Sequence, residues 1–405
     1  MKKIIVLGAG NYQASLIKKA KELNFYVISV DNNPENIGHR YSHKSYNCST
    51  LDKKQVLSIA KKENIDAIIT HASDIAIETI GYVNDILNLT GISCLQAQCL
   101  TKKEKFRLLQ KKLKLFHPDY CIISDINTTI RTYDTLKRKK YILKPSDRSG
   151  SLGITTLDLS QIEQKEFMTL ANEAIHLSLS KIAIVEEYIS GDAFSAEGFF
   201  INNELRIFVT QKQHYNSSLI PLSHIFPNPH SSEIIPLLKQ QLLAIFGDLN
   251  ISRCVFDLDG VFTKNKEVFI IELSPRTGGN YIPEIIKRST NIDLISISLQ
   301  IALGNKVEVN LEEKISYYTG IKLLVSEKSG VLQRAKVMLS NIQMFDEIEY
   351  ETILEKQEGD SVKAFQDGSK KIGYILCQNK DIKQIEHLFS NIGLETFYEV
   401  DYANI

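Results

Sequence analysis

The sequence predicts an α/β protein that begins with a parallel, Rossmann-like sheet and ends in a smaller α+β lobe. Three observations support this fold class. Apolar strand patterns alternate with helical patterns through the first hundred residues, which is typical of βαβ units. Longer strand patterns with hairpin turns follow in the middle of the chain. In the last hundred residues, short alternating strands with Gly turns precede a single helical pattern.

The first segment alternates strands and helices in a regular order. Its strand patterns lie at 4–7, 26–31 and 67–70, and its helical patterns at 14–23, 53–63 and 74–88. Gly8-x-Gly10 follows the first strand and Asp31 ends the second, as in a dinucleotide-binding site. However, Gln13 occupies the position of the third glycine. A Rossmann-like half without a dinucleotide therefore fits at least as well, and an NAD-dependent oxidoreductase remains an alternative.

The central segment places a lysine and a Ser/Gly-rich loop between two strands. A basic amphipathic helix is predicted at 101–115, and a later strand ends in Lys144 before the loop returns into a strand at 154–157. Glycines let backbone N–H groups approach phosphate oxygens, and the lysine supplies positive charge. Because the loop does not open a helix and lacks Gly-Lys-Ser/Thr, we interpret it as a flexible lid over a phosphate, not a Walker P-loop.

A helix at 161–179 precedes another buried strand pattern at 182–185. This strand ends in Glu186-Glu187-Tyr188-Ile189, where carboxylates lie beside exposed backbone. Backbone groups at such a strand end can read an adenine edge while a carboxylate accepts a hydroxyl or amino group. A solvated acidic strand end is the alternative. Further strands are predicted at 194–200 and 205–211.

Two carboxylates are predicted to face each other on antiparallel strands, at 253–258 and 268–273. Asp259 and Glu272 flank a hairpin turn, and Arg276 follows four residues after Glu272 in a Pro/Gly turn. Burying carboxylates and a guanidinium is costly unless they are paired or hold something charged. Since Mg²⁺ takes one or two carboxylates plus phosphate oxygens, the group suits a Mg²⁺–nucleotide site. A helix is then predicted at 283–303.

Taken in order, these features resemble the ATP-grasp superfamily of carboxylate–amine ligases. The order is a basic helix, a strand ending in Lys, a Gly lid, a strand ending in Glu-Glu, a hairpin Asp and Glu-x-Ser-Pro-Arg-x-Gly-Gly. The resemblance implies a Rossmann-like pre-ATP-grasp domain at 1–98 and an ATP-grasp domain at 99–307, with a lid subdomain at about 118–184. A C-terminal α+β lobe then covers 308–405, with strands at 317–325 and 372–377 and a helix at 381–391.

The resemblance also implies roles for single residues. Arg276, Lys144 and Glu272 would be catalytic, with Arg276 steadying an acyl-phosphate and the tetrahedral adduct. Asp259, Glu272 and Ser274 would hold Mg²⁺, or Mn²⁺. The nucleotide-binding residues would be Lys103 (with Lys102 as an alternative register), Lys144, the lid residues Ser149, Gly150, Ser151 and Gly153, and Glu186, Glu187, Tyr188, Ile189 and Asp192 around the base and ribose.

Two positions depart from the family pattern. Ser274 stands where the third metal ligand is usually Asn, and a hydroxyl is a poorer Mg²⁺ ligand than an amide oxygen. Ala193 stands where the ribose-binding Glu normally follows Gly191, so Asp192 or Glu187 would replace it. Neither change removes a group that phosphoryl transfer requires.

The function implied is an ATP-dependent carboxylate–amine ligase that forms an amide through an acyl-phosphate and releases ADP and phosphate. Its partners would be a small carboxylate, such as an amino acid, and an amine. The motifs are similar to those of L-amino-acid ligases, of purine-pathway ligases such as phosphoribosylglycinamide synthetase, and of carbamoyl-phosphate-synthase-like proteins. A phosphoribosylglycinamide-synthetase-like ligase and a non-catalytic nucleotide-binding module are the alternatives.

Composition excludes several other classes of partner. Lys+Arg and Asp+Glu are balanced at 48 each, so nothing suggests nucleic-acid binding. No stretch approaches a membrane span, and the early apolar run is too short for a signal peptide. The six cysteines are scattered, which fits a reducing compartment and a cytoplasmic protein. By analogy with relatives, the first domain would form a homodimer interface.

Overall fold

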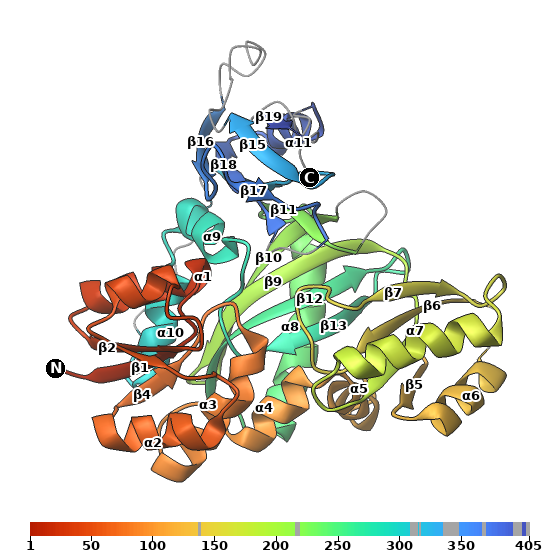
Figure 1. The fold of residues 1–405 in the computed structure, drawn as a ribbon, viewed down its shortest axis with the longest axis horizontal. Helices are drawn as coiled ribbons and strands as arrows, with labels where there is room; N and C mark the ends of the chain where they lie inside the picture. The colour runs from red at the N-terminus through yellow and green to blue at the C-terminus, as the bar shows by residue number, and fades with distance from the viewer. Residues whose placement is uncertain are drawn as a thin grey trace. The chain divides into compact units, whose positions relative to one another are not determined.

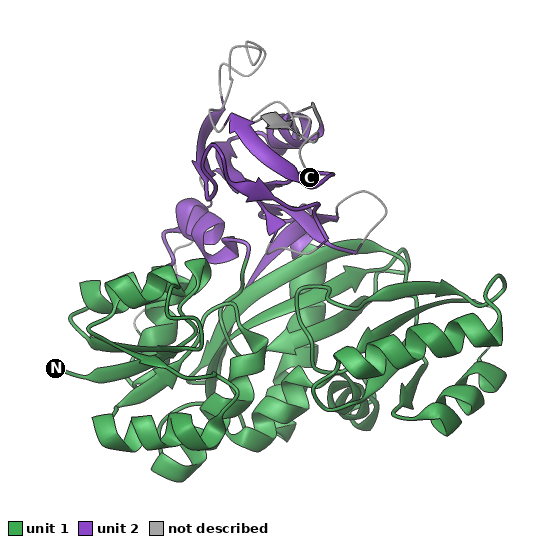
Figure 2. Ribbon diagram, in the orientation of Figure 1, with its two compact units in different colours: residues 1–207, 232–279, 294–308 green, residues 208–231, 280–293, 309–405 purple. Residues whose placement is uncertain are grey.

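The computed structural model describes residues 1–136, 139–214, 219–307, 315, 317–334, 348–366, 370–391 and 399–401. Most of the helices and strands are labelled in Figure 1. The chain forms two compact units (Figure 2): unit 1 holds residues 1–207, 232–279 and 294–308, and unit 2 holds 208–231, 280–293 and 309–405. The observed α/β architecture confirms the fold class expected from the sequence. The division into three domains stays a prediction.

Unit 1 begins with a parallel sheet in the order β3–β2–β1–β4. Its elements are β1 (Lys3–Leu7), α1 (Asn11–Glu22), β2 (Tyr26–Asp31), β3 (Lys44–Asn47), α2 (Lys53–Glu63), β4 (Ala67–Ile69), the short 3₁₀ helix η2 (Asp74–Ala76) and α3 (Ile77–Leu87). Apolar side chains of β1, such as Ile4 and Val6, pack with Leu16 and Ile17 of α1 in a buried core. The predicted alternation of strands and helices in this segment is confirmed.

The loop after β1 uses its backbone donors internally. The Ala9 N–H donates to the Asp31 carboxylate at 2.8 Å, and the Gly10 N–H donates to Oε1 of Gln13 at 3.0 Å. In a dinucleotide site these loop N–H groups face the pyrophosphate. Gln13, which replaces the third glycine, thus occupies one of them with its own side chain. This geometry favours the interpretation of a Rossmann-like half without a dinucleotide.

Helices α4 (Cys94–Thr101) and α5 (Lys103–Lys112) follow. Helix α5 confirms the basic helix predicted at 101–115, although it starts later because Lys102 has an extended backbone. Its inner face is unusually polar, since Lys103, Arg107 and Gln110 are buried beside Phe106. Buried cations need partners, so α5 is an element of a site and not only a packing helix.

An antiparallel sheet in the order β5–β8–β6–β7 comes next in unit 1. Its elements are β5 (Tyr120–Ile123), α6 (Ile126–Thr135), β6 (Lys140–Pro145), β7 (Thr155–Asp158), α7 (Gln164–Leu177) and β8 (Ala183–Glu187). A buried cluster that includes Leu143, Leu157, Phe167 and Val185 joins the strands to α7. Because β6 and β8 pair antiparallel with Ile142 opposite Glu186, Lys144 is a diagonal neighbour of Glu186 on the same face of the sheet.

The rest of unit 1 is built on β9 (Asp192–Ile201), β12 (Arg253–Phe262) and β13 (Val268–Ser274), which pair antiparallel with β12 in the middle. On one face, Phe246 of helix α8 (Ser231–Asp248) contacts the rings of Phe200 and Phe256 at centroid distances of 5.3 and 5.9 Å. The period-two alternation of a strand then places residues such as Glu197 and Asp257 on the opposite face. The face with Phe200 and Phe256 is therefore apolar. The opposite face, called the polar face below, carries Glu197 and Asp257 together with apolar residues such as Phe199 and Val255.

The prediction of one helix at 283–303 is wrong in one respect, because the structure has two helices there. They are α9 (Ile282–Thr290) and α10 (Leu294–Ala302). Asn291 ends α9 in the left-handed conformation with φ 61°, and its N–H donates to the Lys287 carbonyl. Asparagine is one of the residues that tolerates this conformation at a helix end. The apolar periodicity continues across the break, which is why the sequence pattern suggested one helix.

Unit 2 contains β11 (Pro221–Phe226), β14 (Tyr318–Leu324), β18 (Gly373–Asn379) and β16 (Glu349–Leu354), which pair antiparallel in that order. Helix α11 (Ile382–Asn391) packs Ile385, Leu388 and Phe389 into the core of this unit. A second sheet has β15 (Gly330–Arg334) between β17 (Ser361–Val362) and β19 (Glu399–Asp401), and β10 (Glu204–His214) crosses the boundary between the units along the chain. The strands predicted at 317–325 and 372–377 and the helix predicted at 381–391 are confirmed.

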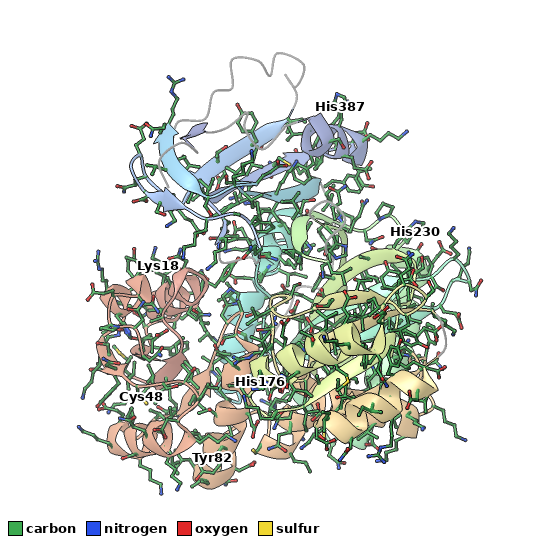
Figure 3. The ribbon with its side chains drawn as sticks, turned by 45° about the vertical axis from the view of Figure 1, so that its right-hand side comes forward. Lys18, Cys48, Tyr82, His176, His230 and His387 are labelled. Carbon is green, nitrogen blue, oxygen red and sulfur yellow. The ribbon has the colours of Figure 1, made fainter. Side chains whose placement is uncertain are left out.

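Side chains of the described residues are drawn in Figure 3. All six cysteines have free thiols, among them Cys48, which is buried and labelled there. Over the described part of the chain, no helix is both long and apolar enough to cross a bilayer.

Candidate active site

The polar face of β9, β12 and β13 carries two rows of side chains. Strand pairing places Asp259 between Ser195 and Glu272, and Asp257 between Glu197 and Ser274. Residues directly opposite each other on antiparallel strands project to the same face. Six polar residues from three separate stretches of sequence therefore meet on one surface, and four of them are carboxylates. Such a surface needs cations, and the neighbouring elements supply several.

The predicted juxtaposition of Asp259 and Glu272 is present, since the two residues are cross-strand partners. Asp259 accepts a hydrogen bond of 2.6 Å from the Ser195 hydroxyl, and Glu272 lies 3.7 Å from the Lys103 ammonium. Within the described ranges, no group of three or more His, Cys, Asp or Glu side chains is arranged to hold a metal ion by itself. A pair of carboxylates nevertheless fits Mg²⁺, which completes its shell with phosphate oxygens and water.

Ser274, the third residue predicted to hold the metal, has another contact. Its hydroxyl donates a 2.5 Å hydrogen bond to Oδ1 of Asp74, which lies at the start of η2. The hydroxyl is therefore turned toward the first segment of the chain. Its role as a metal ligand stays a prediction.

Arg276 lies between two carboxylates. Its guanidinium contacts Oδ1 of Asp74 through Nε at 2.8 Å and Nη2 at 2.6 Å, and Nη1 donates to Asp257. Burial alone would raise the pKa of Asp74, but Arg276 and the Ser274 hydroxyl hold it below its ordinary value. Burial, opposed by Arg276, raises the pKa of Asp257 to about 6. The contacts with both carboxylates hold the guanidinium in one position.

Lys144, Glu186 and Arg107 form a buried ionic cluster. The Lys144 ammonium lies 2.5 Å from Oε2 of Glu186, and Nε of Arg107 lies 2.8 Å from Oε1. Although burial opposes it, the two cations lower the pKa of Glu186. Arg107 also donates to the Ile271 carbonyl at 2.6 Å, which joins α5 to β13. Two cations share one carboxylate, so this cluster has an excess positive charge suited to an anion.

The predicted lid loop connects β6 to β7 and is partly or fully exposed at Ser149, Gly150, Ser151 and Gly153. Gly150 and Gly153 have φ of 67° and 74°, and Ser151 has 62°, which is rare for a residue with a side chain. At the base of the loop the Lys103 ammonium donates to the Arg148 carbonyl at 2.7 Å. Lys103 thus contacts both the loop and Glu272. Lys102, the alternative register, lies 3.3 Å from Glu78 instead.

The predicted adenine-binding strand end is only partly open. The N–H groups of Glu187 and Tyr188 already donate to the carbonyls of Asp119 and Lys140. These two donors are used within the sheet. The role of residues 186–189 in binding adenine stays a prediction. Tyr188 and Asp192 are exposed, and the Glu187 carboxylate lies 2.5 Å from the Lys139 ammonium.

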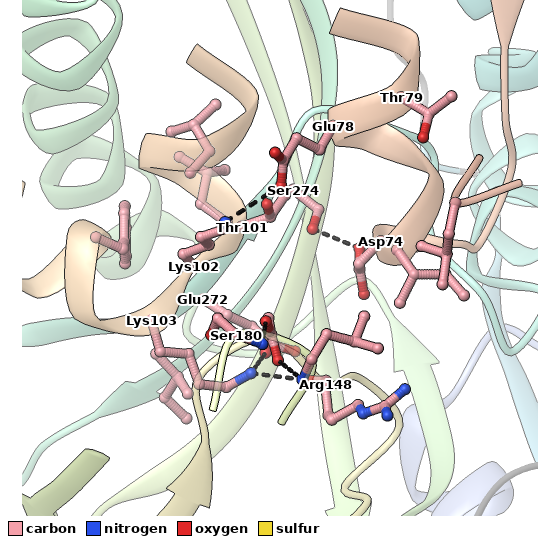
Figure 4. A pocket seen from close by; sticks show the side chains of 18 of the residues that line it. Asp74, Glu78, Thr79, Thr101, Lys102, Lys103, Arg148, Ser180, Glu272 and Ser274 are labelled. Atoms are coloured by element: carbon pink, nitrogen blue, oxygen red, sulfur yellow. Dashed lines mark hydrogen bonds and ion pairs between the residues drawn. The ribbon is translucent and has the colours of Figure 1, made fainter. Parts of the chain in front are cut away.

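A cavity of about 210 Å³ opens beside Lys103, Glu272 and Ser274 (Figure 4). Its walls come from η2 and α3, from the junction of α4 and α5, from Asp147 and Arg148, and from β13. On the side of α3, Glu78 pairs with both Lys53 and Lys102. The cavity thus combines cationic and anionic side chains next to the predicted phosphate-binding and metal-binding residues.

Residues 138–284 match the family model described as an ATP-grasp domain. The chain contains an ATP-grasp domain. The match covers the strands and the lid loop that carry Lys144, Glu186, Asp259 and Glu272. Lys103 and Asp74 lie before the ATP-grasp match.

Similar proteins cover three quarters of the chain or more at low identity. A formate-dependent phosphoribosylglycinamide formyltransferase of Sulfurisphaera tokodaii is 23% identical over 327 residues, 75% of this chain and 76% of that protein. Among solved structures, an L-amino acid ligase from Bacillus licheniformis has a TM-score of 0.81 at 16% identity, covering 100% of this chain and 99% of that one. A phosphoribosylglycinamide synthetase from Anaerococcus prevotii has a TM-score of 0.75 at 23% identity, with coverage of 99% and 100%. The likeness to the two solved structures shows a shared fold, in agreement with the ATP-grasp match at residues 138–284.

Four residues of this ATP-grasp site were not identified from the sequence: Asp74, Arg107, Glu197 and Asp257. For two of them the sequence did contain a partial indication of burial. Arg107 falls on the apolar side of an amphipathic helix, and Asp257 alternates with apolar residues in a buried strand. Either position implies burial of a charge and hence a partner. The partners themselves come from distant segments and could not be read from the pattern.

Proposed function

We propose that this protein is an ATP-dependent carboxylate–amine ligase that forms an amide through an acyl-phosphate. The observation that carries the proposal is the pairing of Asp259 with Glu272 across β12 and β13, with the Lys103 ammonium 3.7 Å from Glu272. Two carboxylates and a lysine at one point suit a metal-bound triphosphate. Asp259 and Glu272 would hold Mg²⁺, which supplies charge neutralisation on the phosphates when bound.

The cluster of Lys144, Glu186 and Arg107 supports nucleotide binding. All three side chains are at most 4% exposed, so their excess positive charge is poorly solvated. Burial lowers the pKa of Lys144 despite the opposing effect of Glu186, which shows that the ammonium is costly to keep there. An anion near Lys144 would relieve this cost. We assign the α- and β-phosphates of ATP to that position, with Lys103 on the terminal phosphate.

The proposed reaction proceeds in two balanced steps. A carboxylate oxygen of the first substrate attacks the γ-phosphorus, and the bond from phosphorus to the ADP oxygen breaks. The amine nitrogen of the second substrate then attacks the carbonyl carbon, the bond from carbon to the phosphate oxygen breaks, and the amine loses a proton. Arg276 would stabilise the negative oxygens that develop in this second step, because Asp74 and Asp257 hold its guanidinium in place.

The cavity beside Glu272 supports a small substrate. Its volume of about 210 Å³ suits a molecule of amino-acid size, and Lys102 with Lys53 on one wall could attract a carboxylate. The likeness to a formate-dependent phosphoribosylglycinamide formyltransferase and to an L-amino acid ligase also supports a small carboxylate as a substrate.

The test is ADP and phosphate release with MgATP, screened against pairs of amino acids, small carboxylates and amines. Release that requires two co-substrates would support the ligase. The acyl-phosphate is tested with a carboxylate labelled with ¹⁸O, because the released phosphate must carry one labelled oxygen. Unlabelled phosphate from a productive pair would rule out the acyl-phosphate route.

A second candidate is a phosphoribosylglycinamide ligase, favoured by the names of the relatives. It is separated from the first by adding two pairs to the same screen: glycine with phosphoribosylamine, for a synthetase, and formate with glycinamide ribonucleotide, for a formyltransferase. Tight MgATP binding with no release from any pair would instead favour a nucleotide-binding module without catalysis. The oligomeric state is tested by sedimentation, with a homodimer as the expected result.

A further inference from the structure

The cavity beside Glu272 has a second charged group on its walls, formed by Glu78, Lys53 and Lys102. Oε1 of Glu78 accepts a hydrogen bond from the Lys53 ammonium, and Oε2 lies 3.3 Å from the Lys102 ammonium. Figure 4 shows Glu78 apart from Glu272, with Ser274 between them. In the part of the chain that the structure describes, neither lysine has a further carboxylate partner. Two cations thus share one carboxylate, which leaves one positive charge in excess on this wall.

The other acidic residues on the walls already have donors. Asp74 binds Arg276, and Asp147 accepts hydrogen bonds from the Ser178 hydroxyl and from two backbone N–H groups. Arg148, also on the wall, donates through Nε to a backbone carbonyl, and among the described residues no carboxylate pairs with its guanidinium. The charges left over on the walls of the cavity are therefore positive. They favour an anionic ligand.

Glu78 could instead be read as a site for an ammonium group of a substrate. However, its Oε1 also accepts a 2.8 Å hydrogen bond from the Gln98 amide, in addition to the contact with Lys53. A substrate ammonium would be a third cation beside Lys53 and Lys102 and would be repelled by both. Glu78 therefore holds the two lysines in place, and an anion is the ligand that this wall favours.

The remaining walls and the volume of the cavity limit the size and the polarity of the ligand. Apolar side chains, among them Ile75, Leu100, Phe106 and Ile271, also line the cavity and suit methylene groups. The volume is about 210 Å³. Since one water molecule needs about 10–15 Å³ on this measure, the cavity has room for a ligand of about ten non-hydrogen atoms together with some water. A short carbon chain with an anionic group at each end meets these conditions.

We propose that the carboxylate substrate is a dicarboxylic acid of about four or five carbons, and that Lys53 and Lys102 are the specificity-determining residues that bind its second carboxylate. The carboxylate that reacts would lie toward Glu272 and Lys103, where the terminal phosphate is assigned. The second carboxylate is not activated, and its charge is balanced by the excess positive charge beside Glu78. That this acid is a reacting substrate rests on the proposed function, whereas its binding to the cavity does not.

Calorimetry with succinate, glutarate and glutamate tests the binding, each acid being compared with its monoamide (succinamate, glutaramate and glutamine). A monoamide has nearly the same shape and one negative charge fewer, so the difference in affinity measures the second carboxylate. The titrations are made at equal ionic strength, with and without MgADP. The preferred acid should bind at least about tenfold more tightly than its monoamide, because the monoamide lacks a charge-assisted hydrogen bond. Equal affinities, or no binding of any of the three acids, would overturn the proposal.

Lys53→Met and Lys102→Met test where the second carboxylate lies. Each variant leaves Glu78 paired with the remaining lysine, so both should fold, which circular dichroism checks. Each should lower the affinity for the dicarboxylate at least about tenfold and reduce the preference over the monoamide. Lys54→Met, an exposed neighbour on α2, is the matched control and should bind as the wild type does. Unchanged affinity in either Lys53→Met or Lys102→Met would contradict the proposal.

Turnover separates this proposal from the proposed function. ADP release should require the dicarboxylate and an amine, and Lys102→Met should raise the KM for the acid at least about tenfold while kcat stays within about twofold. If only monocarboxylates give ADP release, the ligase is supported and the dicarboxylate assignment is wrong. If no pair gives ADP release but calorimetry detects a dicarboxylate that both lysine variants weaken, the proposed function fails and the binding site is supported.

Discussion

Asp74 and Arg276, 202 residues apart in the sequence, form an ion pair with Nη2 and Oδ1 separated by 2.6 Å. Asp74 comes from the segment that precedes the ATP-grasp match, whereas Arg276 lies at the end of that match. The guanidinium is shared with Asp257 and is mostly buried. The first segment of the chain thus contributes directly to the position of the arginine on which the proposed reaction depends.

Replacing Asp74 with Asn should destabilise the protein by about 2 kcal/mol at pH 7, the usual worth of a hydrogen bond to a charged group. The pKa of folded Asp74 is below its ordinary value, so its contribution is complete above that value and is lost as the pH falls through the folded pKa. The difference in unfolding free energy between wild type and variant should therefore shrink below about pH 4. Urea denaturation at several pH values measures it, with the exposed Asp134→Asn as a control. A difference that grew on acidification would contradict the ion pair.

Glu272→Gln should lower ATP turnover by about 100-fold or more, because losing one metal-binding charge removes several kcal/mol of transition-state stabilisation. The side chain is 39% exposed, so the fold should be unaffected and Tm nearly unchanged. Glu267→Gln, in the same hairpin but exposed, is the matched control. Steady-state ADP release measures both. Wild-type turnover in Glu272→Gln would remove this residue from the metal site.

Lys103→Met and Lys102→Met separate the two registers that the sequence left open. Lys103 contacts the lid base and Glu272, whereas Lys102 faces Glu78. Lys103→Met should weaken MgATP binding at least about tenfold, since a phosphate charge loses its partner. Lys102→Met should leave MgATP affinity within about twofold, measured by calorimetry. The reverse order of affinities would place the nucleotide elsewhere.

Lys144→Met and Arg107→Met should affect different properties although both residues contact Glu186: the first should lower MgATP affinity and the second should lower stability. Lys144→Met leaves the pair of Arg107 and Glu186 intact, so stability should change little while MgATP affinity falls. Arg107→Met also removes the bond to the Ile271 carbonyl and should cost about 3–5 kcal/mol, as expected for breaking a buried ion pair. Urea denaturation and calorimetry distinguish the two. Equal losses of stability would show that Lys144 is mainly structural.

Local patterns were enough to predict the elements that carry the site. The hairpin between Asp259 and Glu272 followed from two alternating strands and one turn, and the structure confirms their pairing. The lid loop and the strand ending in Lys144 followed from the glycines and the apolar run before them. Neither prediction required knowledge of a contact with a distant segment, because strand alternation and turn chemistry fix the geometry within about 15 residues.

Contacts between distant segments could not be predicted in the same way. The sequence did not indicate which carboxylates bind Arg276. Ser274 was expected to hold a metal ion, but its hydroxyl donates to Asp74. Nothing in the residues around Asp74 indicates a contact 200 residues later. The break between α9 and α10 was missed for a different reason. The apolar period continues through the break, and apolar periodicity does not reveal that Asn291 adopts the left-handed conformation.

The contacts of the Gln13 side chain limit how the first segment could be replaced in a chimeric protein. Its amide donates to the His71 carbonyl, and the His71 ring is 2.7 Å from the Thr277 hydroxyl, next to Arg276. Burial and the nearby arginine lower the pKa of His71 to about 3, so this link stays uncharged and insensitive to acidity in the physiological range. A chimera that replaced the first segment with a related domain would have to supply these residues together with Asp74. The recombination boundary therefore cannot be chosen from the ATP-grasp match alone.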